Sequence, residues 1–481
     1  MPSFFAPRSS ARAGWLFAYD WDGLALKRLA AQPGTPNFDH AGFDLFSFPS
    51  NLGLPLYDHE RFAAAQAARG RRRRWQAVLS QQEHFGALAA ALVAEKLKLP
   101  GTPPESILAA QHKLHARRVL AQVAPEANLP FAPLPAAYGD DIPPGLTYPA
   151  FVKPVKAAFS VLAREVRDRD ALQAHTRFGR RELWIIRHLV DPFDRLCRAR
   201  LPEAGSAHRM LLEEPVPPPV AQYAQYNLDG WVDNGQVHAL GVVDAVMYPG
   251  TQAFMRWELP SRLAAPAQRR ALDVARRFLA AIGYRHGMFN LEFFHDAASD
   301  RLTVIECNPR LASQFGDLYR RVRGLDPHAM AVALAHGRDA LSAPGCEPNA
   351  NIAASLVYRS FDPAHVPPVP QPAQRAALAH AFPEALMLAF PKHGSALARD
   401  FKWTGSHHYG YVHLGARDRN ELLDHADRAS ALLGWPSPTL DRVAAEAALG
   451  RGEIAVASDG ARSAASAPAD PARLAPALGA D

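Results

Sequence analysis

Two short apolar segments of the chain carry polar side chains at every second position, a spacing typical of strands with one chemical face. Asn290 and Glu292 share a face in the first segment, and Glu306 and Asn308 share a face in the second. The link between the segments, residues 295–300, is short and polar, which predicts that the strands pair as a hairpin. Two carboxylates and an amide oxygen would then meet on one sheet surface. Hard oxygen ligands of this kind suit Mg²⁺, which binds through one or two carboxylates and substrate phosphates.

The composition limits the classes of protein to consider. The chain has 481 residues, too many for one ordinary core, so we expect two to four domains. The 53 basic and 47 acidic residues nearly cancel, which suits anionic small molecules such as nucleotides and gives little reason to expect nucleic acid as a partner. The three cysteines are far apart in the sequence and predict reduced thiols rather than disulfides or a zinc site.

The apolar segments are too short to span a membrane. No run of about 18 apolar residues occurs, and the N-terminus makes a poor signal peptide. We therefore expect a cytoplasmic protein with no membrane partner, and a homodimer is left open.

Exposed glutamates on amphipathic strands are common, so the hairpin alone also fits an ordinary solvated sheet. The order of the polar residues is more specific: Glu292 on one strand, then Glu306-Cys-Asn-Pro-Arg310 on the next. This pattern resembles the metal-binding signature of the ATP-grasp superfamily, over about residues 75–435 of the chain. The resemblance implies that Glu292, Glu306 and Asn308 bind Mg²⁺, or Mn²⁺ in its place, and that Arg310 is catalytic.

The resemblance also implies two lysines that contact ATP phosphates. Lys113 lies within a helix expected over residues 105–122, and Lys153 ends an expected strand. A lysine places a point charge against phosphate oxygens. The turn after Lys153 lacks the glycines that many relatives have there, so we expect the hydroxyl of Ser160 and the charge of Lys156 to compensate.

A hinge for the adenine of ATP is expected near Met210–Val216 by the same resemblance. Glu213 would read the adenine edge, together with the backbone of Glu214 to Val216, where Pro215 has no N–H to donate. Gln225 stands where relatives often have a glutamate for the ribose hydroxyls, and an amide can also hydrogen-bond a diol.

The resemblance implies a ligase that uses ATP and Mg²⁺ to activate a small-molecule carboxylate as an acyl phosphate and joins it to an amine. One alternative is a biotin-carboxylase-like enzyme that activates bicarbonate. Another is a nucleotide-binding regulatory protein with the same fold. A phosphatase built on Asp20-Trp-Asp22-Gly is a more distant alternative, because Leu24 follows where that family has a hydroxyl residue.

The fold class that follows is α/β (α+β), an ATP-grasp fold with a Rossmann-like N-terminal domain and a small C-terminal α+β domain. We expect an N-terminal domain at 1–104, an ATP-grasp domain at 105–340 with a lid at about 148–214, a C-terminal domain at 341–450, and a disordered tail at 451–481.

Several elements can be predicted one by one. We expect Ser106 to cap the helix over 105–122, a strand over 15–19 followed by a turn, and helices over 83–98, 168–178, 266–282 and 419–433. Residues 245–262 and 311–323 are expected to form loops that set substrate specificity. The run Arg71–Arg74 predicts a solvated entrance to a strand, with an anion-binding patch as the alternative.

Overall fold

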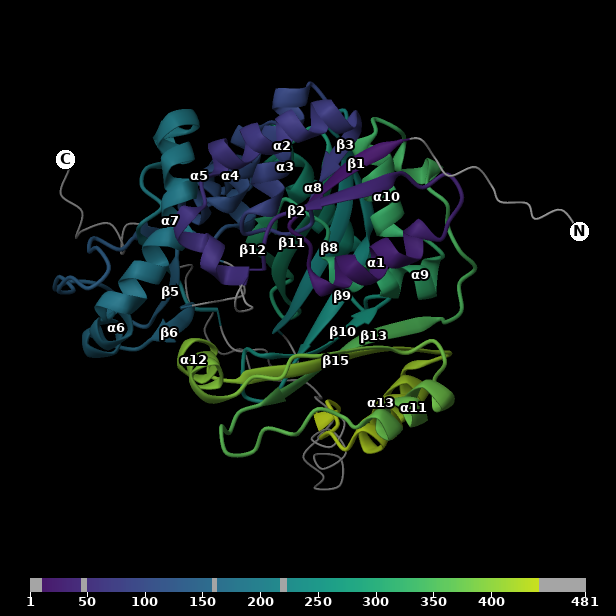
Figure 1. The fold of residues 1–481 in the computed structure, drawn as a ribbon. Helices are drawn as coiled ribbons and strands as arrows, with labels where there is room; N and C mark the ends of the chain where they lie inside the picture. Colours follow the sequence, from purple (N-terminus) through teal and green to yellow (C-terminus); the bar gives the residue numbers. More distant parts are fainter. Residues whose placement is uncertain (1–10, 45–49, 158–161, 217–222, 441–481) are drawn as a thin grey trace, which may run out of the picture.

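The computed structural model describes residues 11–44, 50–157, 162–216 and 223–440. Ser160 and the tail expected at 451–481 lie outside these residues. The described chain forms three sheets with helices around them (Figure 1). Within these ranges, none of the helices combines the length and the apolar character needed to cross a bilayer.

The N-terminal part contains a parallel sheet of three strands in the order β2-β1-β3. Its elements are β1 (Arg12–Leu16), α1 (Asp20–Ala30), β2 (Asn37–Ala41), η1 (Ser50–Leu56), α2 (His59–Arg73), β3 (Trp75–Leu79) and α3 (Gly86–Leu97). Parallel strands joined by helices are the arrangement of a Rossmann-like unit. The turn expected after the first strand is instead the first turn of α1, where Asp22 accepts the Tyr19 N–H at 2.8 Å.

An antiparallel sheet of eight strands forms the centre, in the order β12-β11-β8-β9-β10-β13-β15-β14 (Figure 1). Its strands are β8 (Tyr223–Asp233), β9 (Gln236–Met247), β10 (Phe254–Leu259), β11 (Gly287–Asp296), β12 (Arg301–Asn308), β13 (Ile352–Ser360), β14 (Leu386–Ala389) and β15 (His407–Ala416). The C-terminal strands thus extend the central sheet. The domain limits at residues 104 and 340 stay predictions.

A smaller antiparallel sheet, in the order β4-β7-β5-β6, stands beside the central one. Its strands are β4 (Phe131–Pro133), β5 (Ala150–Pro154), β6 (Arg164–Val166) and β7 (Met210–Glu213), and its helices are α6 (Arg169–Thr176) and α7 (Arg180–Arg200). Helix α6 agrees with the sequence expectation. Helix α7 is not predicted from the sequence, because Pro192 inside it reads as a helix breaker.

The helix expected over 105–122 is two helices, α4 (Pro104–Gln111) and α5 (Lys113–Val123). His112 interrupts them with a ψ of 90°, and its Nδ1 accepts the N–H of His115 at 3.2 Å, so that His112 caps α5. The expectation that Ser106 caps the helix is wrong, since the cap position of α4 is Pro103. The break places Lys113 in the first turn of α5.

Two stretches that we expected to be loops are regular. Residues 254–259 form β10, and residues 313–323 form η4 (Ser313–Phe315) and α9 (Gly316–Arg323). Arg256 and Glu258 on β10 are both buried and form an ion pair with each other. A polar sequence can enter the sheet here because its charges are paired.

The remaining helices include those that lie along the central sheet and its C-terminal extension (Figure 1). They are η2 (Pro125–Ala127), η3 (Pro202–Ala204), α8 (Ala265–Ala281), α10 (Pro327–Ala335), η5 (Ala340–Ser342), α11 (Pro372–Ala381), α12 (Gly394–Thr404) and α13 (Arg419–Leu433). Helices α8 and α13 agree with the sequence pattern, whereas α11 and α12 are not predicted from it.

The apolar face of the β11–β12 hairpin anchors the site. Leu291, Phe293, Val304 and Cys307 are buried in one cluster with Phe278 of α8. Burial of such side chains stabilises a fold by about 1.5–3 kcal/mol each. One face of the hairpin is therefore held by the core, which leaves its polar face free for chemistry.

Candidate active site

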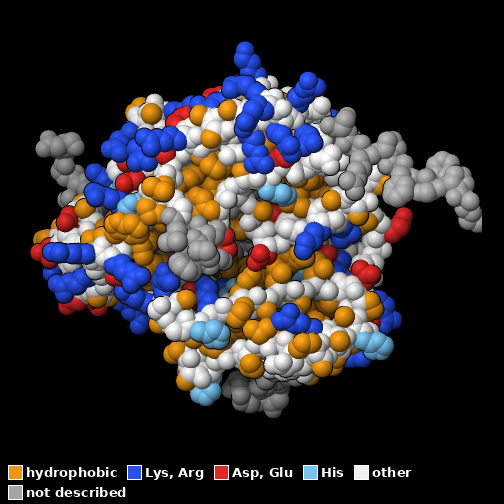
Figure 2. Space-filling view, in the orientation of Figure 1, with side chains coloured by type: hydrophobic (Ala, Val, Ile, Leu, Met, Phe, Trp, Pro, Cys, Tyr) orange, Lys and Arg blue, Asp and Glu red, His pale blue; other side chains and the backbone are white. Residues whose placement is uncertain are grey.

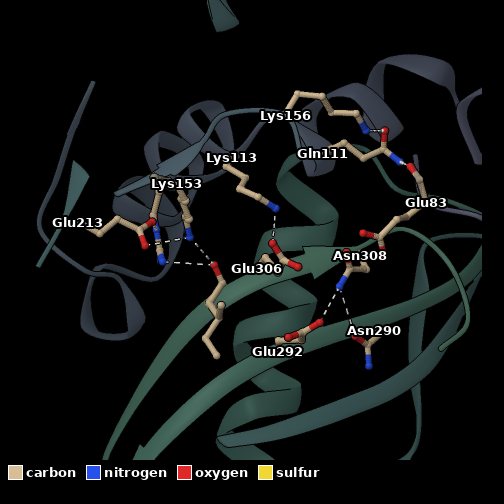
Figure 3. A network of polar contacts seen from close by, with 12 residues as sticks. Glu83, Gln111, Lys113, Lys153, Lys156, Glu213, Asn290, Glu292, Glu306 and Asn308 are labelled. Atoms are coloured by element: carbon tan, nitrogen blue, oxygen red, sulfur yellow. Dashed lines mark hydrogen bonds and ion pairs between the residues drawn. The ribbon is translucent and has the colours of Figure 1, made fainter. Parts of the chain in front are cut away.

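The β11–β12 hairpin forms as expected and brings its polar residues together (Figure 3). Glu292 lies opposite Glu306 in the ladder, and Asn290 lies opposite Asn308. Asn308 Nδ2 donates to Glu292 Oε1 at 3.0 Å, and Gln225 Nε2 of β8 donates to Glu292 Oε2 at 3.2 Å. Two carboxylates and two amides thus share one patch of the sheet.

Lys113 meets this patch from the first turn of α5, where its ammonium forms an ion pair with Glu306. Although burial raises the pKa of Glu306, the charges of Lys113 and Lys153 outweigh this effect and hold that pKa below its ordinary value. Burial and the charge of Glu306 raise the pKa of Glu292 above its ordinary value. The first carboxylate is ionised against a lysine, whereas a cation beside the second would relieve the crowding of negative charge.

Lys153 belongs to a buried network that ties β5, β7, α5 and β12 together. Lys153 Nζ lies 2.8 Å from Glu213 Oε2, and Arg117 Nε donates to Glu213 Oε1 at 2.6 Å. Arg117 also donates to the carbonyl oxygens of Val304 at 2.7 Å and Ile305 at 3.2 Å. Burial lowers the pKa of Lys153 to about 8, against the opposite effect of Glu213. The Glu213 carboxylate is thus engaged by two cations, and its contact with adenine stays a prediction.

Lys156 begins a second chain of contacts, which Figure 3 shows as far as Glu83 and which continues to Arg310. Lys156 Nζ donates to Gln111 Oε1 at 2.7 Å, and Gln111 Nε2 donates to the Glu83 carbonyl oxygen at 2.6 Å. The Glu83 carboxylate accepts from Arg310 Nε at 2.9 Å. Burial lowers the pKa of Lys156 to about 7, and its ammonium nitrogen lies 4.5 Å from the ring centre of Phe193. This chain joins the N-terminal part to the end of β12.

Only some of the groups expected to bind adenine at the hinge are available to do so. The Glu214 N–H donates to the Pro130 carbonyl oxygen at 3.1 Å, so of the two expected backbone donors only Val216 remains a prediction. Gln225 is buried on the sheet beside Glu292, and its contact with a ribose also stays a prediction.

The residues present fit a hard divalent cation. Glu292, Glu306 and Asn308 supply carboxylate and amide oxygens, which are the ligands that Mg²⁺ prefers, and Glu306 already holds the cation of Lys113. Among the described residues, no group of three or more His, Cys, Asp or Glu side chains is arranged to hold a metal ion. The candidate site therefore differs from a histidine- or cysteine-rich metal centre.

Three buried partners of the site are missed by sequence reasoning: Glu83, Gln111 and Arg117. Gln111 and Arg117 lie close to Lys113 in the sequence, one on each side of it. This closeness could have drawn attention to both residues. Glu83 gives no such signal, because it meets Arg310 across 227 residues of chain.

The molecule is hollowed at the centre of the face in Figure 2, where acidic and basic side chains gather at the rim.

No protein-family model and no curated protein matches the sequence, but solved structures match the fold. An L-amino acid ligase from Bacillus licheniformis aligns at a TM-score of 0.61, with 14% identity, over 89% of this chain and 98% of that chain. An N5-carboxyaminoimidazole synthase from Aspergillus clavatus, in complex with ADP and 5-aminoimidazole ribonucleotide, aligns at 0.55, with 14% identity, over 89% and 99%. Biotin carboxylase from Campylobacter jejuni aligns at 0.52, with 17% identity, over 88% and 85%. These structures are ATP-grasp enzymes, and the chain has the fold of the ATP-grasp superfamily.

Proposed function

We propose that the protein is an ATP- and Mg²⁺-dependent ligase, which activates a small-molecule carboxylate as an acyl phosphate and joins it to an amine. The observation that carries this proposal is the meeting of Glu292 and Glu306 with Lys113 on one face of the hairpin. Transfer of a phosphoryl group requires charge compensation and alignment more than covalent help from the protein. A surface with paired carboxylates and converging lysines supplies both.

The reaction has two balanced steps. A carboxylate oxygen of the first substrate attacks the γ-phosphorus of ATP, an O–P bond forms, and the bond to ADP breaks. The amine nitrogen of the second substrate then attacks the carbonyl carbon. The C–N bond forms, the C–O bond to phosphate breaks, phosphate leaves with the electron pair, and the amine releases a proton to solvent.

The residues of the chain have separate tasks in these steps. Lys113 and Lys153 hold phosphate oxygens, each as a point charge. Glu292, Glu306 and Asn308 would hold Mg²⁺, which supplies positive charge against the β- and γ-phosphates. When phosphate enters, Lys113 exchanges its contact with Glu306 for phosphate oxygens.

Arg310 is proposed to bind the acyl phosphate or the oxyanion of the second step. Its guanidinium can make two parallel hydrogen bonds to such an anion. Glu83 contacts the guanidinium through Nε at 2.9 Å and so fixes its direction. Ser160, Glu213, Glu214, Val216 and Gln225 are proposed to complete the ATP site.

A biotin-carboxylase-like reaction is the second candidate, favoured by the similarity of the fold to the Campylobacter jejuni enzyme. It would use the same phosphate and metal residues with bicarbonate as the acid. The two candidates differ in the acid that ATP consumption requires.

The test is ADP and phosphate release from ATP and Mg²⁺, screened over pools of amino acids and other carboxylates, with and without amines, and with bicarbonate alone. Release that needs both a carboxylate and an amine supports the ligase. Release with bicarbonate alone supports the second candidate. Glu306→Gln should abolish either activity, whereas Glu384→Gln, at an exposed position of the C-terminal part, should not.

A further inference from the structure

Three buried polar side chains form a row across three strands behind the proposed metal site. Asn308 of β12 lies opposite Asn290 of β11, and Asn290 lies opposite Asp229 of β8. All three are at most 6% exposed. A row of this kind is unusual inside a sheet, because a buried polar group costs free energy unless it is hydrogen-bonded.

The hydrogen bonds along the row run in one direction. Asn308 Nδ2 donates to Asn290 Oδ1 at 3.4 Å, and Asn290 Nδ2 donates to Asp229 Oδ1 at 2.9 Å. The Tyr319 hydroxyl donates to the other oxygen, Asp229 Oδ2, at 2.9 Å. Each amide therefore turns its nitrogen toward Asp229 and its oxygen away from it.

The direction is set chiefly by Asp229, because an ionised carboxylate only accepts hydrogen bonds. Asn227 Oδ1 also accepts from the Asn290 nitrogen, at the longer distance of 3.4 Å. An asparagine amide has a donating and an accepting end of nearly equal shape, so its orientation is decided by its partners. Asp229 requires the nitrogen of Asn290, and the remaining oxygen of Asn290 requires the nitrogen of Asn308. The Asn308 nitrogen also meets Glu292 Oε1 at 3.0 Å, in the same sense.

Burying the carboxylate of Asp229 at this place in the fold costs free energy. It is fully buried, and the side chains that donate hydrogen bonds to it, Asn290 and Tyr319, are neutral. Burial raises its pKa to about 7, while the hydrogen bonds from Asn290 and Tyr319 act in the opposite sense. Both of its oxygens receive donors, which is the arrangement of the acceptor form. A buried carboxylate that costs free energy and accepts its hydrogen bonds from neutral groups points to a task in the site.

We propose that Asp229 is a positioning residue for the metal site, which acts through Asn290 to turn the oxygen of Asn308 toward the cation. This inference rests on the proposed function in one respect, since it takes Asn308 as a ligand of the metal. It assigns a role to a side chain that touches neither metal nor nucleotide.

The variant Asp229→Asn tests the direction of the row. The introduced amide has one oxygen, and Asn290 competes for it with the Tyr319 hydroxyl, whose other acceptor is the Gly241 carbonyl oxygen at the longer distance of 3.2 Å. When Tyr319 takes that oxygen, the new nitrogen faces Asn290, both native amides turn over, and Asn308 presents its nitrogen to the site. Mn²⁺ serves as the probe, and its affinity in the presence of ADP is measured by electron paramagnetic resonance at about pH 8, where Asp229 is in the acceptor form.

We expect Asp229→Asn to weaken Mn²⁺ binding about tenfold, in the range found for residues that orient metal ligands. In the background of Asn308→Asp, whose side chain has oxygen at both ends, the same change should cost less than about twofold. A purely structural role of Asp229 would produce the same loss in both backgrounds and would overturn the proposal. Unchanged Mn²⁺ affinity in Asp229→Asn itself would do so as well.

Two controls separate positioning from loss of fold. Tyr319→Phe removes a buried hydrogen bond but leaves the contact of Asp229 with Asn290, so Mn²⁺ affinity should stay within about twofold. A tenfold loss there would contradict the proposal. Binding of ADP without metal should be equal in the wild-type protein, in Asp229→Asn and in Tyr319→Phe. A wild-type protein that binds ADP but no Mn²⁺ would refute the metal site and this inference together, whereas normal Mn²⁺ binding with an inert Asp229→Asn would refute the inference alone.

Discussion

Glu292 and Glu306 lie directly opposite each other on paired strands, and only one of them is in contact with a lysine. The Lys113 ammonium balances Glu306, while the hydrogen-bond partners of Glu292 are the neutral amides of Asn308 and Gln225. Two adjacent carboxylates with one resident cation form a site that favours the entry of another cation.

Glu306→Gln should remove the charge on which this site depends while keeping the size of the side chain. We expect ADP formation to fall by about 10²-fold or more, since electrostatic groups at a reacting phosphate have effects of this size. Steady-state ADP release, with Glu384→Gln as the matched control, measures the effect. A loss of less than about fivefold would place the cation elsewhere.

Arg310→Lys should slow the reaction without weakening the binding of the nucleotide. A lysine keeps the positive charge but cannot make the paired contacts of a guanidinium, so we expect kcat to fall about 10²-fold. The affinity for ADP should change less than about twofold, because the phosphates are assigned to Lys113 and Lys153. A variant with normal kcat and weakened ADP binding would show that Arg310 belongs to the nucleotide site.

Arg117→Met should destabilise the fold, because it leaves Glu213 with one of its two cations and frees two carbonyl oxygens of β12. Removing one partner of a buried ion pair typically costs about 3–5 kcal/mol. The midpoint of urea unfolding should therefore fall clearly. The neighbouring Arg118→Met is the matched control, since Arg118 is exposed, and it should cost about 1 kcal/mol or less. Equal midpoints for the two variants would contradict the account of this network.

Lys156→Met should stabilise the protein in a manner that depends on pH. Burial lowers the pKa of Lys156 to about 7 in the folded chain, against about 10.4 when it is unfolded. The cost of burying its charge is complete below about pH 7 and disappears as the pH rises toward about 10, where both states are neutral. The gain in Tm from Lys156→Met should therefore be largest near pH 7 and small near pH 10.

The titratable groups around Lys156 do not produce the same pH dependence of the gain in Tm. Its charged and titratable neighbours are Glu83, Lys113, Cys197, Glu306, His59 and His84. Burial lowers the pKa of both histidines, so they stay neutral over the range that is measured. The exposed Lys27→Met should show no pH-dependent gain. A gain from Lys156→Met that is equal at both ends of the range would mean that its ammonium is not buried at a cost.

The parts of the fold that follow local rules could be predicted from the sequence. The β11–β12 hairpin and helix α13 each carry their own periodicity. Strand β10 could not be predicted, because its polar residues are buried through contacts with each other and with distant segments. The sequence predicts α4 and α5 as one helix, because nothing local in it marks His112 as a cap.

The residues of the candidate site also fall into those that could be predicted from the sequence and those that could not. Glu292, Glu306 and Asn308 come together as expected, because their alternating spacing fixes the face of a strand. Lys113 reaches Glu306 from the first turn of α5, and the break at His112 that starts this helix is not predicted from the sequence. Glu83 and Asp229 act through contacts made only in three dimensions, with Arg310 and Asn290 respectively. Supporting residues of this kind carry no local signature, since their partners lie on other strands or other sheets.

The most direct test of the account follows oxygen from the carboxylate to phosphate. The substrate pair found in the screen is supplied with ¹⁸O in its carboxylate, and the phosphate released with ADP is analysed by mass spectrometry. If the carboxylate attacks the γ-phosphorus, one ¹⁸O atom from the acid appears in each phosphate. Unlabelled phosphate, or release of AMP and pyrophosphate in place of ADP, would contradict activation as an acyl phosphate.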